Sequence, residues 1–379
     1  MPKIVWQSNS PLAGTGYGNQ TYIFTKLLKE AGWEVIVAAN YGLSGSQLEY
    51  DGITILPKGL DMWGNDVIKP HYEAYKPDVY MTLFDVWILK PEAWKDVPLA
   101  AWIPVDHDPA PPAVLDMSAK IPFPIAMSKF GESTLRDHAI DPLYMPHGVV
   151  TNIFEPMDRS EARKRFHVED DTFFVVMNAA NKGQPSRKGF EAVLKAWSLF
   201  VKDHPKSQLY MHTLPLPVHQ GLDLFQLVKY HHITPEHIRF PHVYDYVMGN
   251  YKWDYLVNMY NAADCVLAPS SGEGFGIPVI EAHSCGCPTI VSDFTAQAEL
   301  GSAYKIPINK LDDLITTGQY SEWVIPRVSA ILEGLEYMYE HRGDMELREK
   351  ARVEGLRYDA LKVFEEHMLP NFDTIMQLS

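Results

Sequence analysis

Cysteine is scarce in this chain, and long apolar stretches are missing from it. The three cysteines among 379 residues are Cys265, Cys285 and Cys287, and none is part of a four-ligand zinc pattern. Such a small, odd number argues against a disulfide framework, so we expect buried thiols. No stretch approaches the roughly 18 apolar residues that a membrane-spanning helix needs. The opening residues, MPKIVWQS, lack the apolar centre of a secretory signal, which predicts a cytoplasmic protein.

Positive charge is also under-represented. Lysine and arginine contribute 33 residues against 48 aspartates and glutamates, which gives a formal net charge of −15. This balance argues against general affinity for nucleic acid or for an anionic membrane, while it leaves a local basic pocket and peripheral membrane association open. The hydrophobic share of 46% and the charged share of 21% are ordinary for a globular protein, and the length allows two domains.

Short apolar runs alternate with amphipathic stretches along the chain. The strands expected in the first half are residues 3–7, 34–39, 79–83, 99–105 and 122–127. Those expected in the second half are residues 173–177, 209–212, 238–240, 265–268 and 289–291. A pair of charged helices is expected near the C-terminus, most clearly over residues 345–364. This β-α-β alternation predicts an α/β protein with doubly wound, mostly parallel sheets.

A segment punctuated by proline and glycine divides the two halves. It covers residues 146–156 (PHGVVTNIFEP), and such composition is typical of a domain boundary. We therefore predict an N-terminal domain over residues 1–150 and a second domain over residues 151–355. Residues 356–379 are expected to form a C-terminal helix that can return to the first domain.

The most informative segment is residues 270–282 (SSGEGFGIPVIEA). It follows an apolar run, and Pro278 suits the first turn of a helix, where its missing N–H costs nothing. A glycine loop between strand and helix directs backbone N–H groups and the positive end of the helix dipole at a phosphate. Glu273 and Glu281 add acceptors for hydroxyl groups, a combination that suits a nucleotide sugar. The alternative is an ordinary strand-to-helix turn in which the glutamates only complement the dipole.

The same segment resembles the Glu-x7-Glu signature of the retaining glycosyltransferases of family 4 (glycosyl transferases group 1), including its Gly-Phe-Gly-x-Pro. Residues 146–156 resemble that family's interdomain motif Pro-Asn-Gly-Val-Asp-x-x-x-Phe-x-Pro, with His147 for Asn and Val150 for Asp. The resemblance implies the GT-B fold, in which two Rossmann-like doubly wound domains face a central cleft. It also implies transfer of a sugar from a UDP- or GDP-sugar to a hydroxyl acceptor with retention of configuration.

The resemblance assigns donor binding to this segment. It implies that the amides around Gly274, Phe275 and Gly276 hold the donor diphosphate. Glu281 would accept hydrogen bonds from the ribose hydroxyls, and Glu273 would accept them from the hydroxyls of the transferred sugar.

Two adjacent cations precede the Gly-Phe pair that opens the next expected helix. Lys188 matches the family's lysine before glycine, whereas the family's arginine usually stands near residues 178–181 and is here replaced by Arg187. Both cations are expected to stabilise the leaving diphosphate. Because no carboxylate is recognisable as a covalent nucleophile, we expect a front-face mechanism without a metal ion or another cofactor.

The first domain contributes weaker candidates. Gly16 and Gly18 belong to a glycine-rich loop (GTGYGNQ) after the first strand, and the resemblance places Gly16 near the donor and Gly18 on the acceptor side. Asp106 and His107 end another strand, at the edge where open α/β sheets bind ligands, and are expected to touch the sugar or the acceptor. Ser128 follows the next strand and is a further candidate for the acceptor side.

Several other functions are disfavoured by the motifs. Asn19 stands where a dinucleotide fingerprint needs its third glycine, and no Gly-x4-Gly-Lys-Ser/Thr loop occurs. The Asp-x-Asp formed with Asp108 is a weak signal for manganese because the two cations already supply countercharge. A GT-B sugar-nucleotide epimerase or hydrolase, and a non-catalytic nucleotide-sugar-binding protein, remain as alternatives. The acceptor cannot be identified from these motifs, since acceptor loops vary within a fold.

Overall fold

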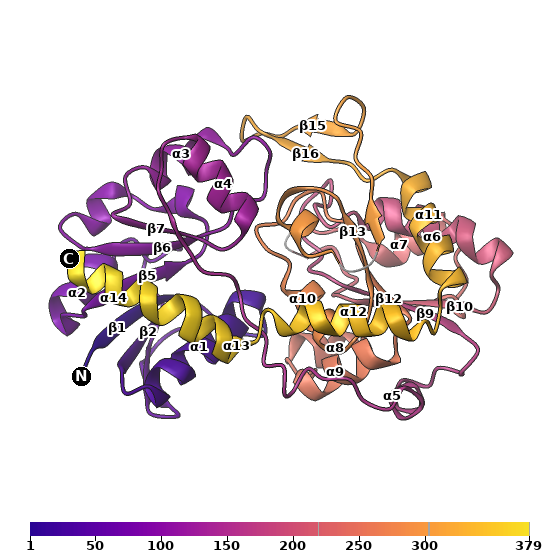
Figure 1. Ribbon diagram of the computed structural model, residues 1–379, viewed down its shortest axis with the longest axis horizontal. Helices are drawn as coiled ribbons and strands as arrows, with labels where there is room; N and C mark the ends of the chain where they lie inside the picture. Colours follow the sequence, from indigo (N-terminus) through magenta and orange to yellow (C-terminus); the bar gives the residue numbers. More distant parts are fainter. Residues whose placement is uncertain (219, 302–303, 379) are drawn as a thin grey trace. The chain divides into compact units, whose positions relative to one another are not determined.

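The computed structural model describes residues 1–218, 220–301 and 304–378, and these form two compact units (Figure 1). Unit 1 contains Met1–Val150, Gly318–Ser321 and Tyr358–Ser379. Unit 2 contains Thr151–Thr317 and Glu322–Arg357. Within the described ranges, no helix combines the length and the apolar character needed to cross a membrane.

Unit 1 is built on an eight-stranded sheet with the order β3-β4-β2-β1-β5-β6-β7-β8. The strands are β1 Lys3–Asn9, β2 Glu34–Tyr41, β3 Leu48–Tyr50, β4 Ile53–Leu56, β5 Val79–Leu83, β6 Leu99–Ile103, β7 Phe123–Ala126 and β8 Leu143–Tyr144. Its helices are α1 Gly16–Glu30, α2 Ile68–Tyr75, α3 Pro112–Ser118, α4 Lys129–Asp137, α13 Ala360–Val363 and α14 Leu369–Leu378. The pairings are parallel except between β3 and β4. The predicted α/β class with a doubly wound sheet is confirmed here.

The centre of this sheet is buried on both faces. Strands β5 and β6 consist entirely of buried residues, as expected for parallel strands covered by helices. Trp102 packs edge-on against Trp6 and Phe24, with ring centroids 6.2 and 5.8 Å apart. Large buried rings of this kind contribute much of the apolar area that stabilises the unit.

The C-terminal segment belongs to unit 1. The Val149 amide donates to the Tyr358 carbonyl at 2.8 Å, and the Ala360 amide donates to the Val149 carbonyl at 2.8 Å. Farther along, Asn371 donates through Nδ2 to the Tyr144 carbonyl at 3.0 Å. The Phe372 ring lies 5.5 Å from that of Trp33. These contacts fix α14 on the N-terminal sheet unit.

The pair of charged helices predicted near the C-terminus, most clearly over residues 345–364, is present, and the structure shows where the two helices divide. Helix α12 (Met345–Leu356) ends before Arg357, and α13 begins only at Ala360. The Asp359 carboxylate caps α13 by accepting from the amides of Leu361 and Lys362 at 3.1 and 3.2 Å. A side chain that caps a new helix competes with continuation of the preceding one, so a charged, periodic stretch becomes two helices.

Unit 2 is built on a six-stranded parallel sheet with the order β11-β10-β9-β12-β13-β14. The strands are β9 Phe173–Asn178, β10 Ser207–His212, β11 Ile238–Arg239, β12 Cys265–Ala268, β13 Thr289–Ser292 and β14 Tyr304–Ile306. The helices are α5 Arg159–Phe166, α6 Phe190–Asp203, α7 Leu224–Tyr230, α8 Val243–Val247, α9 Trp253–Ala262, α10 Ile277–Ser284, α11 Val328–Glu340 and α12. A hairpin of β15 (Leu314–Thr316) and β16 (Glu322–Val324) stands apart from this sheet. Because successive strands run outward from β9 and from β12, the strand order reverses between these two.

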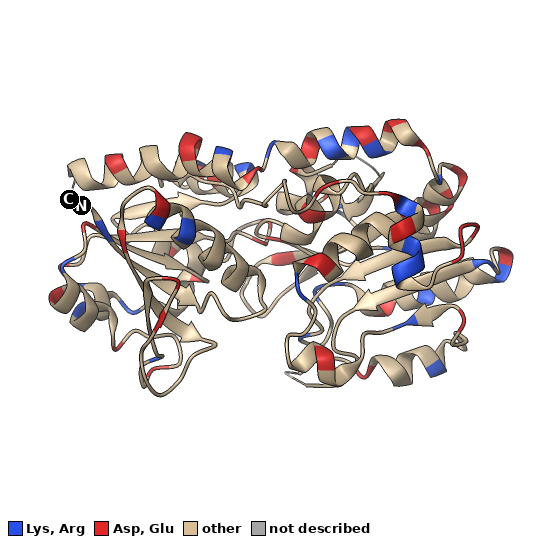
Figure 2. Ribbon diagram, turned by 90° about the horizontal axis from the view of Figure 1, so that it is seen from below, with Lys and Arg blue, Asp and Glu red and all other residues tan. Residues whose placement is uncertain are grey.

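Charged residues lie mainly outside both sheets. Figure 2 shows the strands mostly in tan, with blue and red segments gathered on helices and loops. Strand β9 has five buried residues followed by a partly exposed Asn178 at its carboxyl end. The three cysteines are buried and unpaired by disulfides, as the sequence predicts.

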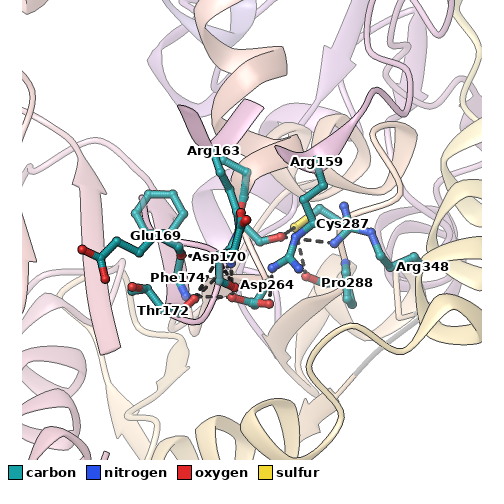
Figure 3. Close-up of polar contacts among 12 residues, drawn as sticks. Arg159, Arg163, Glu169, Asp170, Thr172, Phe174, Asp264, Cys287, Pro288 and Arg348 are labelled. Carbon is teal, nitrogen blue, oxygen red and sulfur yellow. Dashed lines mark hydrogen bonds and ion pairs between the residues drawn. The ribbon is translucent and has the colours of Figure 1, made fainter. Parts of the chain in front are cut away.

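A buried ion cluster fastens α5 to the sheet of unit 2 (Figure 3). The Asp264 side chain, just before β12, is paired with both Arg159 and Arg163, the latter at 2.8 Å between Nη2 and Oδ2. Its Oδ2 also accepts from the Phe174 amide in β9 at 2.8 Å. Arg163 in turn donates to the Thr172 carbonyl at 3.1 Å. One carboxylate thus joins α5, the start of β9 and the start of β12.

Replacing Asp264 by asparagine should destabilise unit 2 by about 3 kcal/mol or more, because two arginines then lose their buried countercharge. Denaturant unfolding of the full chain measures this change in the free energy of unfolding. The matched control is Asp171→Asn, which removes only an exposed carboxylate paired with Lys206 and should leave stability nearly unchanged. Equal effects of the two substitutions would contradict the assigned role of the buried cluster.

Candidate functional site

The strand order of unit 2 places a small cavity at the carboxyl ends of β9 and β12. Ligands of doubly wound sheets bind at such a reversal of strand order. The residues that line the cavity are Met177, Asn178, Ala179, Lys188, Ala268, Ser270, Glu273, Gly276, Pro278, Val279 and Gln297. Lys188, Glu273 and Gly276 are residues that the sequence predicts as site residues, and they meet here although they come from two different loops.

The loop between β12 and α10 has a conformation that depends on glycine. Gly276 precedes the first residue of α10 with φ +119°, a region that side chains rarely adopt. A Cβ atom on Gly276 would also lie 3.0 Å from Cδ1 of Leu300. Pro278 occupies the first turn of α10, as predicted, and Phe275 is 3% exposed. The helix therefore begins directly at the cavity with its backbone N–H groups toward the loop.

Glu273 is the centre of the charged part of the site. Its Oε2 accepts from Nη1 of Arg187 at 3.1 Å, and its Oε1 is paired with Nζ of Lys188. The Glu273 amide donates to Oγ1 of Thr295 at 2.9 Å. Burial opposes ionisation of this carboxyl, but the charges of Arg187 and Lys188 outweigh it and lower its pKa to about 2. Glu273 is therefore an anion at neutral pH.

The loop that carries the two cations is held against the glutamate loop through the backbone. The Ser271 amide donates to the Arg187 carbonyl at 2.7 Å, and the Arg187 side chain reaches the Gly272 carbonyl. Gly189 has φ +74°, and a Cβ atom there would lie 2.8 Å from the Pro269 carbonyl oxygen. Glycine thus permits the close approach that brings both cations to one carboxylate.

Glu281 lies deeper in unit 2, and its surroundings are neutral. The carboxylate is 6% exposed, and its Oε2 accepts from the Tyr260 hydroxyl at 2.8 Å. Burial raises the pKa of Glu281 from 4.5 to about 7, while the hydrogen bond from Tyr260 acts in the opposite direction. Glu281 is absent from the cavity lining, whereas Asn178, which donates to the same Tyr260 hydroxyl at 2.7 Å, is part of it.

The glycine-rich loop of unit 1 forms the start of α1. Thr15 precedes this helix, and its Oγ1 accepts from the Gly18 amide at 3.0 Å and from Nδ2 of Asn9 at 2.8 Å. A Cβ atom on Gly18 would lie 2.2 Å from the Ala13 carbonyl oxygen, so this position requires glycine for local packing. Gly16 is the first helical residue and is exposed.

The remaining candidates of unit 1 follow β6 and β7. Asp106 and His107 contact each other, with 2.6 Å between Oδ1 and Nδ1. Ser128 is fully buried, and its Oγ accepts from the Gly131 amide at 3.0 Å as the cap of α4. Ser128 thus has a local structural contact, and its expected place on the acceptor side stays a prediction.

Sequence reasoning missed two residues at the site of unit 2. Asn178 could have been noticed because it ends a buried strand at the carboxyl edge of the sheet. The role of Tyr260 could not be recognised from the sequence, because the residue occupies a buried position of α9 like its apolar neighbours. Over the residues with described positions, no group of three or more His, Cys, Asp and Glu side chains is arranged to hold a metal ion.

Comparison with known proteins identifies what this arrangement is similar to. Residues 242–310 match the family described as "Glycosyl transferases group 1". A D-inositol 3-phosphate glycosyltransferase of Geodermatophilus obscurus is 32% identical over 165 residues, which is 40% of this chain and 32% of the relative. The serotype-specific mannosyltransferase WbdA of Escherichia coli is 30% identical over 116 residues, or 30% of this chain and 13% of that protein. The match therefore spans about a third or less of these relatives.

Solved structures show the same fold over nearly the whole chain. Sucrose-phosphate synthase from Thermosynechococcus elongatus has a TM-score of 0.77 at 16% identity and covers 100% of both chains. Anabaena HepE in complex with UDP-glucose has a TM-score of 0.68 at 13% identity, over 96% of this chain and 97% of that one. The predicted GT-B fold is confirmed, and so is the resemblance to the group 1 glycosyltransferases.

The raised pKa of Glu281 predicts a pH-dependent stability. The folded state binds a proton up to a pKa of about 7, whereas the unfolded carboxyl releases it near 4.5, so stability falls as pH rises between these values. Glu281→Gln removes this dependence. Its free energy of unfolding relative to the wild type should increase by about 3 kcal/mol between pH 5 and pH 8.

Denaturant unfolding of both proteins at the two pH values measures this difference. Glu346→Gln, an exposed substitution in the first turn of α12, is the control and should show no such change. A constant difference between Glu281→Gln and the wild type would contradict the raised pKa.

Proposed function

We propose that this chain is a glycosyltransferase that moves a sugar from a nucleotide-sugar donor, a UDP- or GDP-sugar, to a hydroxyl acceptor. The observation that carries the proposal is the convergence of Arg187 and Lys188 on Glu273 beside a glycine loop at the strand reversal of unit 2. A diphosphate needs cations and amides, and a sugar needs acceptors for its hydroxyl groups. This one site offers all of these groups.

The comparisons support the donor class. HepE, whose structure resembles this chain over nearly its full length, has been solved in complex with UDP-glucose and, in another structure, with UDP. The group 1 match covers the segment that contains the Glu-x7-Glu signature and α10. We therefore place the nucleotide sugar in unit 2 and assign the unidentified acceptor to a separate site.

The charges of the site suggest how donor binding proceeds. Glu273 pairs with both cations, and its single negative charge leaves a net positive charge on the three groups. A bound diphosphate would take over Arg187 and Lys188, and the released carboxylate oxygens would accept hydrogen bonds from the hydroxyl groups of the sugar. Before the donor binds, Arg187 and Lys188 hold the pKa of Glu273 near 2, so the carboxyl group that meets the donor is ionised and can only accept. The two cations and the carboxylate thus stand side by side before the donor arrives, and binding exchanges their partners.

The chemical step that we propose retains the anomeric configuration. The bond between the anomeric carbon and the phosphate oxygen breaks, and the acceptor oxygen forms its bond on the same face. The acceptor proton passes to the departing phosphate oxygen. Arg187 and Lys188 stabilise the negative charge that develops there, so no metal ion is required. In this step Glu273 accepts hydrogen bonds from the hydroxyl groups of the sugar and does not act as a covalent nucleophile.

Release of sugar from donor tests the proposal without knowledge of the acceptor. Purified protein is incubated with UDP- and GDP-sugars labelled in the sugar, and transfer or slow hydrolysis is followed. Lys188→Ala should lower the rate about 100-fold, because one stabilising cation of the leaving group is lost. Lys182→Ala removes an exposed lysine of the same loop and should leave the rate unchanged.

Three outcomes would contradict the proposal or one of its parts. Donor binding without any release or transfer of sugar would indicate a non-catalytic binding protein. A near-normal rate for Lys188→Ala would refute the role of that lysine. Loss of activity in EDTA that Mn²⁺ restores would refute the metal-free step.

A further inference from the structure

A buried chain of hydrogen bonds runs from the cavity to Glu281 and has no part in the function proposed above. Asn178 donates through Nδ2 to the Tyr260 hydroxyl at 2.7 Å, and that hydroxyl donates to Oε2 of Glu281 at 2.8 Å. The three residues come from the end of β9, from α9 and from α10. Tyr260 is 0% exposed and Glu281 is 6% exposed, so water does not substitute for these contacts.

The directions of these hydrogen bonds follow from the protons available. Burial, followed by the charge of Glu281, raises the pKa of Tyr260 well above 10, so its hydroxyl keeps its one proton at neutral pH. The Tyr260 hydroxyl donates that proton to Oε2 of Glu281, and the Tyr260 oxygen can therefore only accept from its other neighbour. This neighbour must be the NH₂ group of Asn178. The carbonyl oxygen Oδ1 of Asn178 is consequently turned away from Tyr260.

The free end of the chain lies where a ligand would bind. Asn178 lines the same cavity as Lys188 and Glu273. Oδ1 is an acceptor with two lone pairs, and on a partly exposed residue that lines the cavity it can accept from a ligand that brings a donor. Hydroxyl groups are the donors that a nucleotide sugar offers in number. Glu281, by contrast, has one oxygen already engaged by Tyr260.

We propose that Asn178 accepts a hydrogen bond from a hydroxyl group of the nucleotide sugar, and that Tyr260 is the positioning residue that fixes the Asn178 amide through its bond to Glu281. This inference rests on the proposed function. It changes the expected role of Glu281, which acts on the ligand through Tyr260 and Asn178. The hydroxyl belongs either to the ribose or to the transferred sugar, and the experiment below distinguishes these two sources.

The test compares ligands with and without the hydroxyl groups. Calorimetry first gives the affinity of the wild type for UDP and for GDP. The nucleotide that binds more tightly is then compared with its 2′-deoxy analogue, its 3′-deoxy analogue and its glucose conjugate. Tyr260→Phe keeps the buried ring and removes only the hydroxyl. If Asn178 binds the ribose, Tyr260→Phe should weaken the ribonucleotide about 10-fold and leave one deoxy analogue unaffected.

If Asn178 binds the transferred sugar instead, only the affinity for the glucose conjugate should fall, by the same factor. Asn178→Ala should reproduce the pattern of Tyr260→Phe, which also covers the case in which the tyrosine variant folds poorly. The control is Tyr255→Phe on the same helix, which loses a hydrogen bond to the Tyr210 hydroxyl (2.7 Å) away from the cavity lining. Its affinities should equal those of the wild type.

Two results would overturn the inference. Unchanged affinities of both variants would show that the amide does not bind the ligand. An equal loss for all ligands, deoxy analogues included, would show that Tyr260 only supports the fold. A wild type that binds no nucleotide would instead overturn the proposed function, and this inference with it, before any variant is measured.

Discussion

The pairing of Glu273 with Arg187 and Lys188 is the interaction on which the site of unit 2 depends. Burying a carboxylate costs free energy unless cations compensate for its lost hydration. Here each of the two Glu273 oxygens is paired with one cation. The cations reach it because Gly189 lets their loop approach the Pro269 carbonyl oxygen of the neighbouring loop closely. The bond from the Ser271 amide to the Arg187 carbonyl then fixes the spacing of these loops. A binding site for an anion is thus built before any anion is present.

The two glutamates of the signature have opposite electrostatic environments. Cations hold the pKa of Glu273 near 2, whereas burial raises that of Glu281 to about 7. Environments that separate the pKa values of two nearby carboxyl groups commonly mark different roles. In our account, Glu273 is the permanent anion that exchanges partners with the ligand. Glu281 is the end of a hydrogen-bond chain that orients Asn178 through Tyr260.

Much of the fold could be predicted from the sequence, because buried parallel strands appear as short apolar runs between helices. Residues 173–177 and 265–268 are strands as expected, and Pro278 lies in the first turn of α10. The glycine loop was recognisable from its residue types and spacing. The position of the break at Asp359 could not be predicted, because the same charged pattern continues on both sides of it. Only the capping contact of the Asp359 side chain shows where the second helix begins.

The parts of the site that could not be predicted depend on contacts between distant residues. Asn178 and Tyr260 are 82 positions apart, and only the fold brings their side chains together. The Asp264 cluster is similar, because Arg163 lies 101 positions before the aspartate that it neutralises. A lone tyrosine or arginine in a helix gives no sign of such a partner. The family resemblance placed Glu281 at the ribose, and it contained no information on the hydroxyl that covers its carboxylate.

The most direct test of the central claim is the dependence of affinity on the ligand's phosphates. Calorimetry on the wild type would compare uridine, UMP and UDP, and the same guanosine series, at low and at high salt. If Arg187 and Lys188 are poised for a diphosphate, affinity should rise by at least about 10-fold for each added phosphate in one series, and the gain should shrink at high salt. Equal affinities for nucleoside and nucleoside diphosphate would contradict the account, because the cations would then serve only to hold Glu273.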